Sequence, residues 1–201
     1  ASVTYPKLTT YGQSKLAGET AVRACRSFDH TIVRPTLVYD ETGGQEFTMF
    51  LAYLQRFAVV PFIGSGAARK RPVFSGDVID GLAALCANER AYGKIYNFSG
   101  KERISVLDLA RLMLAHHGIA KPFVKVPVPL CRLAAAVMGR VLAEPPVNEY
   151  TIAAMLNDAD LDPGEAMRDI GYAPIGVYEG FRRCFSHSAT AISNVVTEGA
   201  Q

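Results

Sequence analysis

The chain has 201 residues, of which 49% are hydrophobic and 20% are charged. This composition is typical of a globular protein and excludes an intrinsically disordered one. Lys and Arg number 21 and Asp and Glu number 19, for a net charge of +2. Because the chain is so close to neutral, it lacks the basic footprint of nucleic-acid binding, and we expect no nucleic acid partner.

The first half of the chain alternates helical and strand patterns. Thr9 or Thr10 can cap a helix that runs to about Ser27, and Asp77 is predicted to cap another over residues 78–88. A further helical pattern covers residues 47–57. The predicted strands and turn are His30–Arg34, Val59–Ile63, a turn at Gly64–Gly66, Pro72–Phe74 and Lys94–Phe98.

The second half is mostly helical in pattern. Ser105, with Asp108 three residues later, is predicted to cap a helix that ends near Gly118. The remaining predictions are a strand at 123–126, helices at 129–139, 150–156, 163–170 and 176–185, and a mobile tail at 186–201. The alternation of strands and helices favours an α/β fold class.

Four cysteines are spread along the chain without a Cys-x-x-Cys pair, and residues 1–6 show no signal-peptide pattern. Both features favour reduced thiols and a cytoplasmic location. The longest apolar tract, residues 126–143, is broken by prolines and arginines, so we predict no membrane span. A bundle helix is favoured for this tract, with an interfacial helix or an acyl-chain pocket as the alternative. The cysteines are Cys25, Cys86, Cys131 and Cys184.

The segment from Tyr11 to Lys15 is the most informative in the sequence. A Tyr and a Lys four residues apart on a helix project from the same face, which places an ammonium near a phenol. A positive charge beside a phenol favours the phenolate, the form that can accept a proton. The pair therefore suits removal of a proton from a substrate hydroxyl, and Lys15 is also free to hold the ribose hydroxyls of a cofactor.

The string from Tyr11 to Glu19 resembles the active-site helix of the extended short-chain dehydrogenase/reductases, the NAD-dependent epimerase/dehydratase family. Later segments resemble further motifs of that family in the same order, so that the resemblance extends to about Phe185. These segments are Arg34–Tyr39, Gly64–Gly66, Lys70–Val78, Tyr96–Gly100 and Asp160–Pro174.

The resemblance implies a catalytic and cofactor-binding role for three residues. Tyr11 would be the general acid/base, and Lys15 would tune it and hold the nicotinamide ribose of NAD or NADP. Pro35 would flank the nicotinamide.

The resemblance also implies a small-molecule substrate, a nucleotide sugar or a similar hydroxyl or keto compound. Thr36 would contact it, and Lys70 and Arg71 would meet its phosphate groups, since basic side chains bind phosphate oxygens strongly. Phe74 and Gly76 occupy positions that are often polar or acidic in the family.

The family's Gly-x-x-Gly-x-x-Gly turn, which cradles the cofactor pyrophosphate at a helix N-terminus, does not occur in the 201 residues. Ser2 and Thr4 lie closer to Tyr11 than the family's catalytic Ser or Thr does, so that role is not assigned. These observations predict the C-terminal part of a longer enzyme, which binds its cofactor weakly or not at all in this form.

The expected fold is a partial Rossmann-like sheet, with late strands only, and a mostly helical C-terminal substrate domain. Residues 1–100 would be the remnant of the NAD-binding domain with an interleaved substrate-domain segment. Residues 101–185 would be the substrate-binding domain, followed by a flexible tail at 186–201. The unpaired sheet edges would favour a homodimer.

Two other functions stay open: a non-catalytic scaffold or regulatory binding protein of the same fold, and an inactive truncation. No metal site is predicted. Adjacent residues such as His116 and His117 point in different directions on a helix. Asp158, Asp160 and Asp162 lack the glycine and the bidentate glutamate of a calcium loop.

Overall fold

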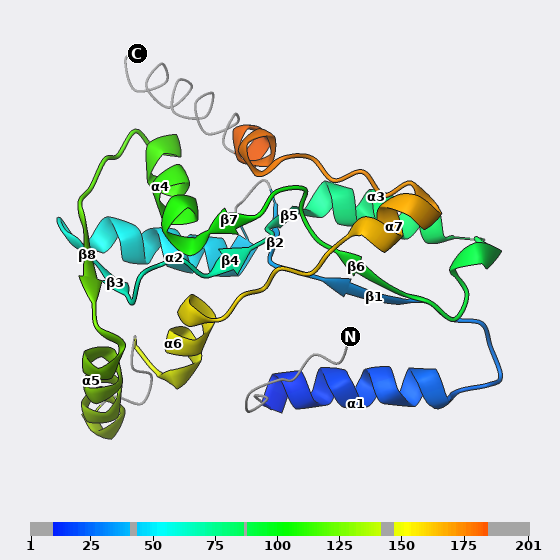
Figure 1. Cartoon of the computed structure of the whole chain (residues 1–201), viewed down its shortest axis with the longest axis horizontal. Helices are drawn as coiled ribbons and strands as arrows, with labels where there is room; N and C mark the ends of the chain where they lie inside the picture. The colour runs from blue at the N-terminus through cyan, green and yellow to red at the C-terminus, as the bar shows by residue number, and fades with distance from the viewer. Residues whose placement is uncertain (1–9, 41–43, 87, 142–146, 185–201) are drawn as a thin grey trace, which may run out of the picture.

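A computed structural model describes residues 10–40, 44–86, 88–141 and 147–184 (Figure 1). The expectations for Ser2, Thr4 and the tail at 186–201 lie outside these ranges.

Two parallel strands form the centre of the α/β part. β1 (Ile32–Pro35) pairs with β6 (Ile95–Phe98), with Pro35 opposite Phe98. In Figure 1, α3 (Ser75–Leu85) and α7 (Gly164–Ile170) lie on one side of this pair, and α1 (Thr10–Ala24) runs along the other. The α/β class and strands near these two positions were predicted, and both are confirmed.

Three further strand pairs join segments that are far apart in the sequence. Two are parallel, β2 (Val38–Tyr39) with β5 (Val73–Phe74) and β3 (Val60–Ile63) with β8 (Phe123–Val126). The third, β4 (Arg69–Lys70) with β7 (Ile104–Ser105), is antiparallel. The strand predicted at Pro72–Phe74 is present as β5, whereas β2, β4 and β7, also of two residues each, were not predicted.

The remaining helices cover these strands. They are α2 (Gly44–Arg56), the 3₁₀ helix η1 (Glu89–Ala91), α4 (Val106–His116), α5 (Val128–Val141), α6 (Glu149–Leu156) and a last helix at residues 177–184.

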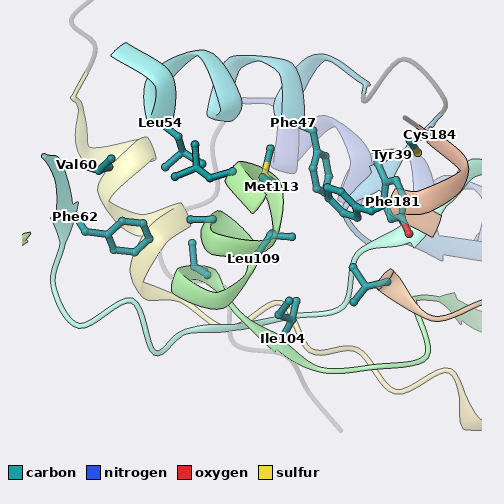
Figure 2. Packing of buried hydrophobic residues seen from close by; sticks show 14 residues of the cluster. Tyr39, Phe47, Leu54, Val60, Phe62, Ile104, Leu109, Met113, Phe181 and Cys184 are labelled. Carbon is teal, nitrogen blue, oxygen red and sulfur yellow. The ribbon is translucent and has the colours of Figure 1, made fainter. Parts of the chain in front are cut away.

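The largest hydrophobic cluster lies between α2, α4, β3 and the helix at 177–184 (Figure 2). Tyr39 is its aromatic centre, because its ring lies 5.3 Å from that of Phe47 and 5.2 Å from that of Phe181, centroid to centroid. Burial raises the pKa of the Tyr39 hydroxyl, so this phenol stays neutral. The cluster draws residues from both sides of the predicted boundary at residue 100, and that boundary stays a prediction.

The end of α2 is fixed by a lysine from a distant segment. Lys121 Nζ donates hydrogen bonds to the carbonyl oxygens of Gln55 at 2.6 Å and Phe57 at 2.8 Å. The last carbonyls of a helix have no partner within the helix, and a lysine amine both satisfies them and complements the negative end of the helix dipole. Lys121 therefore joins α2 to the start of β8.

The predicted caps of α4 are confirmed, and the predicted cap of α3 is not. Ser105 Oγ accepts the Asp108 N–H at 3.0 Å, and Gly118 closes α4 with a φ of 66°, both as predicted. The prediction that Asp77 caps α3 is wrong. The helix begins two residues earlier at Ser75, and the Asp77 carboxylate instead accepts the Ile175 N–H at 3.0 Å, from a segment that sequence spacing does not reveal.

Candidate functional site

Tyr11 and Lys15 lie on the first turns of α1 and face one another. Lys15 Nζ is 5.4 Å from the centroid of the Tyr11 ring, within the range of a cation–π contact. Tyr11 is 72% exposed, so its hydroxyl is open to a ligand. The predicted geometry of the pair is therefore present: an ammonium beside an accessible phenol.

α1 as a whole is weakly packed. None of its described residues is buried, although it carries apolar side chains such as Leu16, which is 43% exposed. Glu19 connects α1 to β1: its carboxylate accepts from Arg34 Nη2 at 2.5 Å and from Arg34 Nε at 3.0 Å. This bidentate pair holds the pKa of Glu19 below its ordinary value. It orients the helix that carries Tyr11 and Lys15.

We expect Glu19→Gln to loosen α1 at neutral pH, lowering the hydrogen-exchange protection of its amides by about threefold to tenfold, the usual size of a partly exposed ion pair. The lowered pKa gives the sign of the pH effect. The contribution of the pair is complete above the ordinary carboxyl pKa of 4.5 and is lost as the pH falls through the lowered folded-state value. Glu46→Gln on the exposed face of α2 is the control, and equal protection in both variants would contradict the assignment.

Pro35 and Thr36 lie where β1 ends. Pro35 is the last residue of the strand, and the Thr36 N–H donates to the Phe98 carbonyl at 3.1 Å. The Thr36 hydroxyl donates to the Arg71 carbonyl at 2.6 Å. This hydroxyl therefore fastens the end of β1 to the segment between β4 and β5.

Arg71 is held by an acidic loop. Its Nε donates to Asp160 Oδ1 at 2.5 Å and its Nη1 to the Lys101 carbonyl at 3.1 Å. Arg103 Nη2 lies 2.6 Å from the other oxygen of Asp160. Asp160, together with Asp158, whose Oδ1 accepts the Arg69 N–H at 2.7 Å, thus anchors the loop between α6 and α7 to the end of β4. The sequence could not reveal this, because Arg71 and Asp160 are 89 residues apart.

Lys70 is bound to the same loop. Its Nζ donates to the Asn157 carbonyl at 2.7 Å, and burial lowers the pKa of its ammonium. The structure thus places Lys70 and Arg71 together at β4, and it places Tyr11 with Lys15 on α1.

Neither a metal centre nor a membrane span is found in the ranges that the structure describes. No group of three or more His, Cys, Asp or Glu residues there could hold an ion. None of the described helices combines the length and apolar content needed to cross a bilayer.

A family model described as the RmlD substrate binding domain matches residues 3–138. The chain belongs to the RmlD substrate-binding domain family. The dTDP-L-rhamnose 4-epimerase of Burkholderia thailandensis is 31% identical over 132 residues, which is 61% of this chain and 36% of that protein. The 2'-dehydrokanamycin reductase of Streptomyces kanamyceticus is 33% identical over 133 residues, 62% of this chain and 37% of the reductase.

Solved structures confirm the fold of this RmlD-family chain. A dTDP-glucose 4,6-dehydratase from Streptomyces venezuelae, DesIV, solved with NAD bound, superposes with a TM-score of 0.62 at 21% identity, over 87% of this chain and 49% of that one. A UDP-glucuronic acid 4-epimerase from Bacillus cereus in complex with NAD gives 0.62 at 18% identity, over 91% and 52%. The family match together with these structures bears out the predicted resemblance to the NAD-dependent epimerase/dehydratases.

The chain spans about a third of the length of its curated relatives, 36% of the epimerase and 37% of the reductase. It spans about half of the solved structures, 49% of the dehydratase and 52% of the epimerase.

Proposed function

We propose that the chain carries the catalytic residues of an NAD(P)-dependent oxidoreductase of the epimerase/dehydratase type, acting on a nucleotide sugar or a similar hydroxyl or keto substrate. The observation that carries this proposal is the Tyr11–Lys15 pair, face to face and accessible on α1. Membership of the RmlD substrate-binding domain family supports it.

The chemistry proposed for the pair is a proton transfer. Tyr11 Oη takes the proton of a substrate hydroxyl as that carbon becomes a carbonyl, with the Lys15 ammonium beside the Tyr11 ring. In the reverse direction Tyr11 returns the proton. NAD or NADP, when bound, supplies the acceptor or donor of the hydride.

The described residues fit the nicotinamide ribose of that cofactor but not its pyrophosphate. An exposed Lys15 amine beside a phenol suits the nicotinamide ribose. Gly64 and Gly66 form a turn with positive φ, but a Cβ at Gly66 would lie 2.7 Å from the Phe62 ring and 2.8 Å from Leu107. This turn is shaped by core packing, and it does not offer the open cradle that a pyrophosphate needs. We therefore propose weak cofactor binding by these 201 residues.

Thr36, Lys70 and Arg71 are the proposed substrate contacts. Lys70 ends β4 and Arg71 follows it, and both are bonded to the loop between α6 and α7. We propose that they contact the phosphates of a nucleotide-linked substrate. Pro35, at the end of β1, is proposed to flank the nicotinamide.

Reduced nicotinamide mononucleotide tests the cofactor assignment, because it carries the nicotinamide ribose without the adenosine half. We expect saturation-transfer NMR to show contact with its ribose protons in the wild-type chain and in the control Lys125→Met, and to lose that contact in Lys15→Met. Equal signals in the three proteins, or none in the wild type, would overturn the role of Lys15.

A non-catalytic binding subunit is the second candidate. The protein named NADH dehydrogenase [ubiquinone] 1 alpha subcomplex subunit 9, mitochondrial, from Rattus norvegicus is 29% identical over 143 residues, 69% of this chain and 35% of that protein. By its name that relative is a subunit of a larger assembly. An unchanged phenotype for Tyr11→Phe in the full-length protein would favour this function.

Two further expectations belong to the proposal. The exposed surface of α1 supports a homodimer, since a single helix of this length is marginal without packing. No disulfide joins the four cysteines in the part of the chain that the structure describes, which supports a cytoplasmic location.

A further inference from the structure

α5 presents an apolar stripe to solvent. Its members are exposed by 52% to 80% and follow one another at intervals of three, four and four residues, so they share one face of the helix. They are Leu130, Leu133, Val137 and Val141, named here the α5 stripe. Scattered single apolar residues on a surface are ordinary, but four in register on one helix form a continuous surface.

The opposite face of α5 is firmly packed. Cys131 and Ala135 are buried with Ile152 of α6, and Val126 and Val128 pack against them. The helix is therefore held by its inner face, and the α5 stripe points away from that packing. In Figure 1, α5 extends from β8 at one end of the molecule.

The charges around the α5 stripe are cationic. From residue 109 to residue 141 the sequence contains Lys and Arg but no Asp or Glu. Lys125 on β8 and Arg140 within α5 are both exposed, and Arg140 lies three residues after Val137. The carboxylate of Glu149 on α6 lies 3.7 Å from Arg132, which helical periodicity places on the far side of α5 from the stripe.

A second exposed apolar face gives a contrast. On α3, Ile79 is 64% exposed and Leu82 is 46% exposed, but exposed Asp80 lies between them. An anionic surface would attract α5 and repel α3. Apolar side chains bordered by basic ones on a single helix are the pattern of a helix that lies in the plane of a lipid interface.

We propose that α5 docks on an anionic lipid surface, with the α5 stripe entering the acyl boundary and Lys125 and Arg140 contacting headgroup phosphates. This contact is peripheral and is independent of the proposed oxidoreductase activity. It gives a function to the apolar tract at residues 126–143.

Vesicle flotation tests the docking. The chain is mixed with vesicles of phosphatidylcholine alone and with vesicles of equal parts phosphatidylcholine and phosphatidylglycerol. We expect wild type to float with the anionic vesicles, and Leu133→Gln with Val137→Gln to lower the partition coefficient by about tenfold or more, since two half-exposed apolar side chains no longer enter the lipid. Ile79→Gln with Leu82→Gln on α3 is the matched control, expected to float as wild type does.

A charge variant separates the electrostatic part of the lipid contact from the part made by the apolar α5 stripe. Lys125→Glu with Arg140→Glu should abolish the preference for phosphatidylglycerol while leaving the circular dichroism melt unchanged. Three results would overturn the proposal: no flotation of wild type, equal flotation of the stripe variant and wild type, or a stripe variant that changes the oligomeric state in size-exclusion chromatography without lipid. The last result would assign the α5 stripe to a second copy of the chain.

Discussion

Tyr11→Phe is expected to lower turnover of the proposed nucleotide-sugar substrate by ~10²–10⁴-fold, the usual contribution of a general acid/base. The substitution removes only the hydroxyl, and the 72% exposure of Tyr11 means that no buried partner is lost with it. Folding and substrate affinity should therefore be unchanged, and the loss should appear in kcat. Steady-state kinetics with a panel of nucleoside-diphosphate sugars measures it.

The matched control is Tyr178→Phe, since Tyr178 is also well exposed, at 64%. It should retain full activity. A Tyr11→Phe protein with unchanged kcat would remove Tyr11 from the chemistry and leave the binding-subunit function as the better explanation.

Phe98→Ala is expected to destabilise the fold by ~3–5 kcal/mol, the range for deleting a fully buried aromatic side chain. Phe98 is 0% exposed, and its ring stacks on that of Tyr172 with 4.6 Å between centroids and 9° between planes. A Cβ at Gly81 would lie 2.6 Å from the Phe98 ring, so α3 approaches this ring as closely as a glycine allows. Chemical denaturation measures the change in the free energy of unfolding.

Phe28→Ala is the control for this substitution, because Phe28 is 56% exposed and its removal leaves no internal cavity. A loss below ~1 kcal/mol for Phe98→Ala would show that the β6–α3–α7 contact closes around the missing ring.

Local signals in the sequence were enough to predict most helices and the longer strands. Ser105 and Gly118 mark the ends of α4 through contacts within three to five residues of each, and such contacts can be inferred from spacing alone. Asp77 shows the limit of that inference. The position of Asp77 in the sequence suggests a cap for α3. Its carboxylate instead accepts a hydrogen bond from the backbone N–H of Ile175, 98 residues away.

The residues of the candidate site also fall into two groups, those whose contacts are local in the sequence and those whose contacts depend on tertiary packing. Tyr11 and Lys15 are neighbours on one helix, so helical periodicity predicted that they face each other. The surroundings of Lys70 and Arg71 depend on Asn157 and Asp160, which tertiary packing alone brings to β4. The proposed chemistry depends on both the Tyr11–Lys15 pair and the contact of its helix with Arg34 through Glu19, but only the pair can be inferred from the sequence.

The carboxylate–guanidinium pair between Glu19 and Arg34 has a consequence for the proposed catalysis. Reacting atoms must be placed to a fraction of an ångström, because small misplacements are costly in rate. None of the described residues of α1 is buried, so the Glu19–Arg34 pair helps to place this helix without a packed face beneath it. We therefore expect the placement of the Tyr11 hydroxyl to depend on the surface that covers α1, so that the proposed activity would be gained by assembly on that helix.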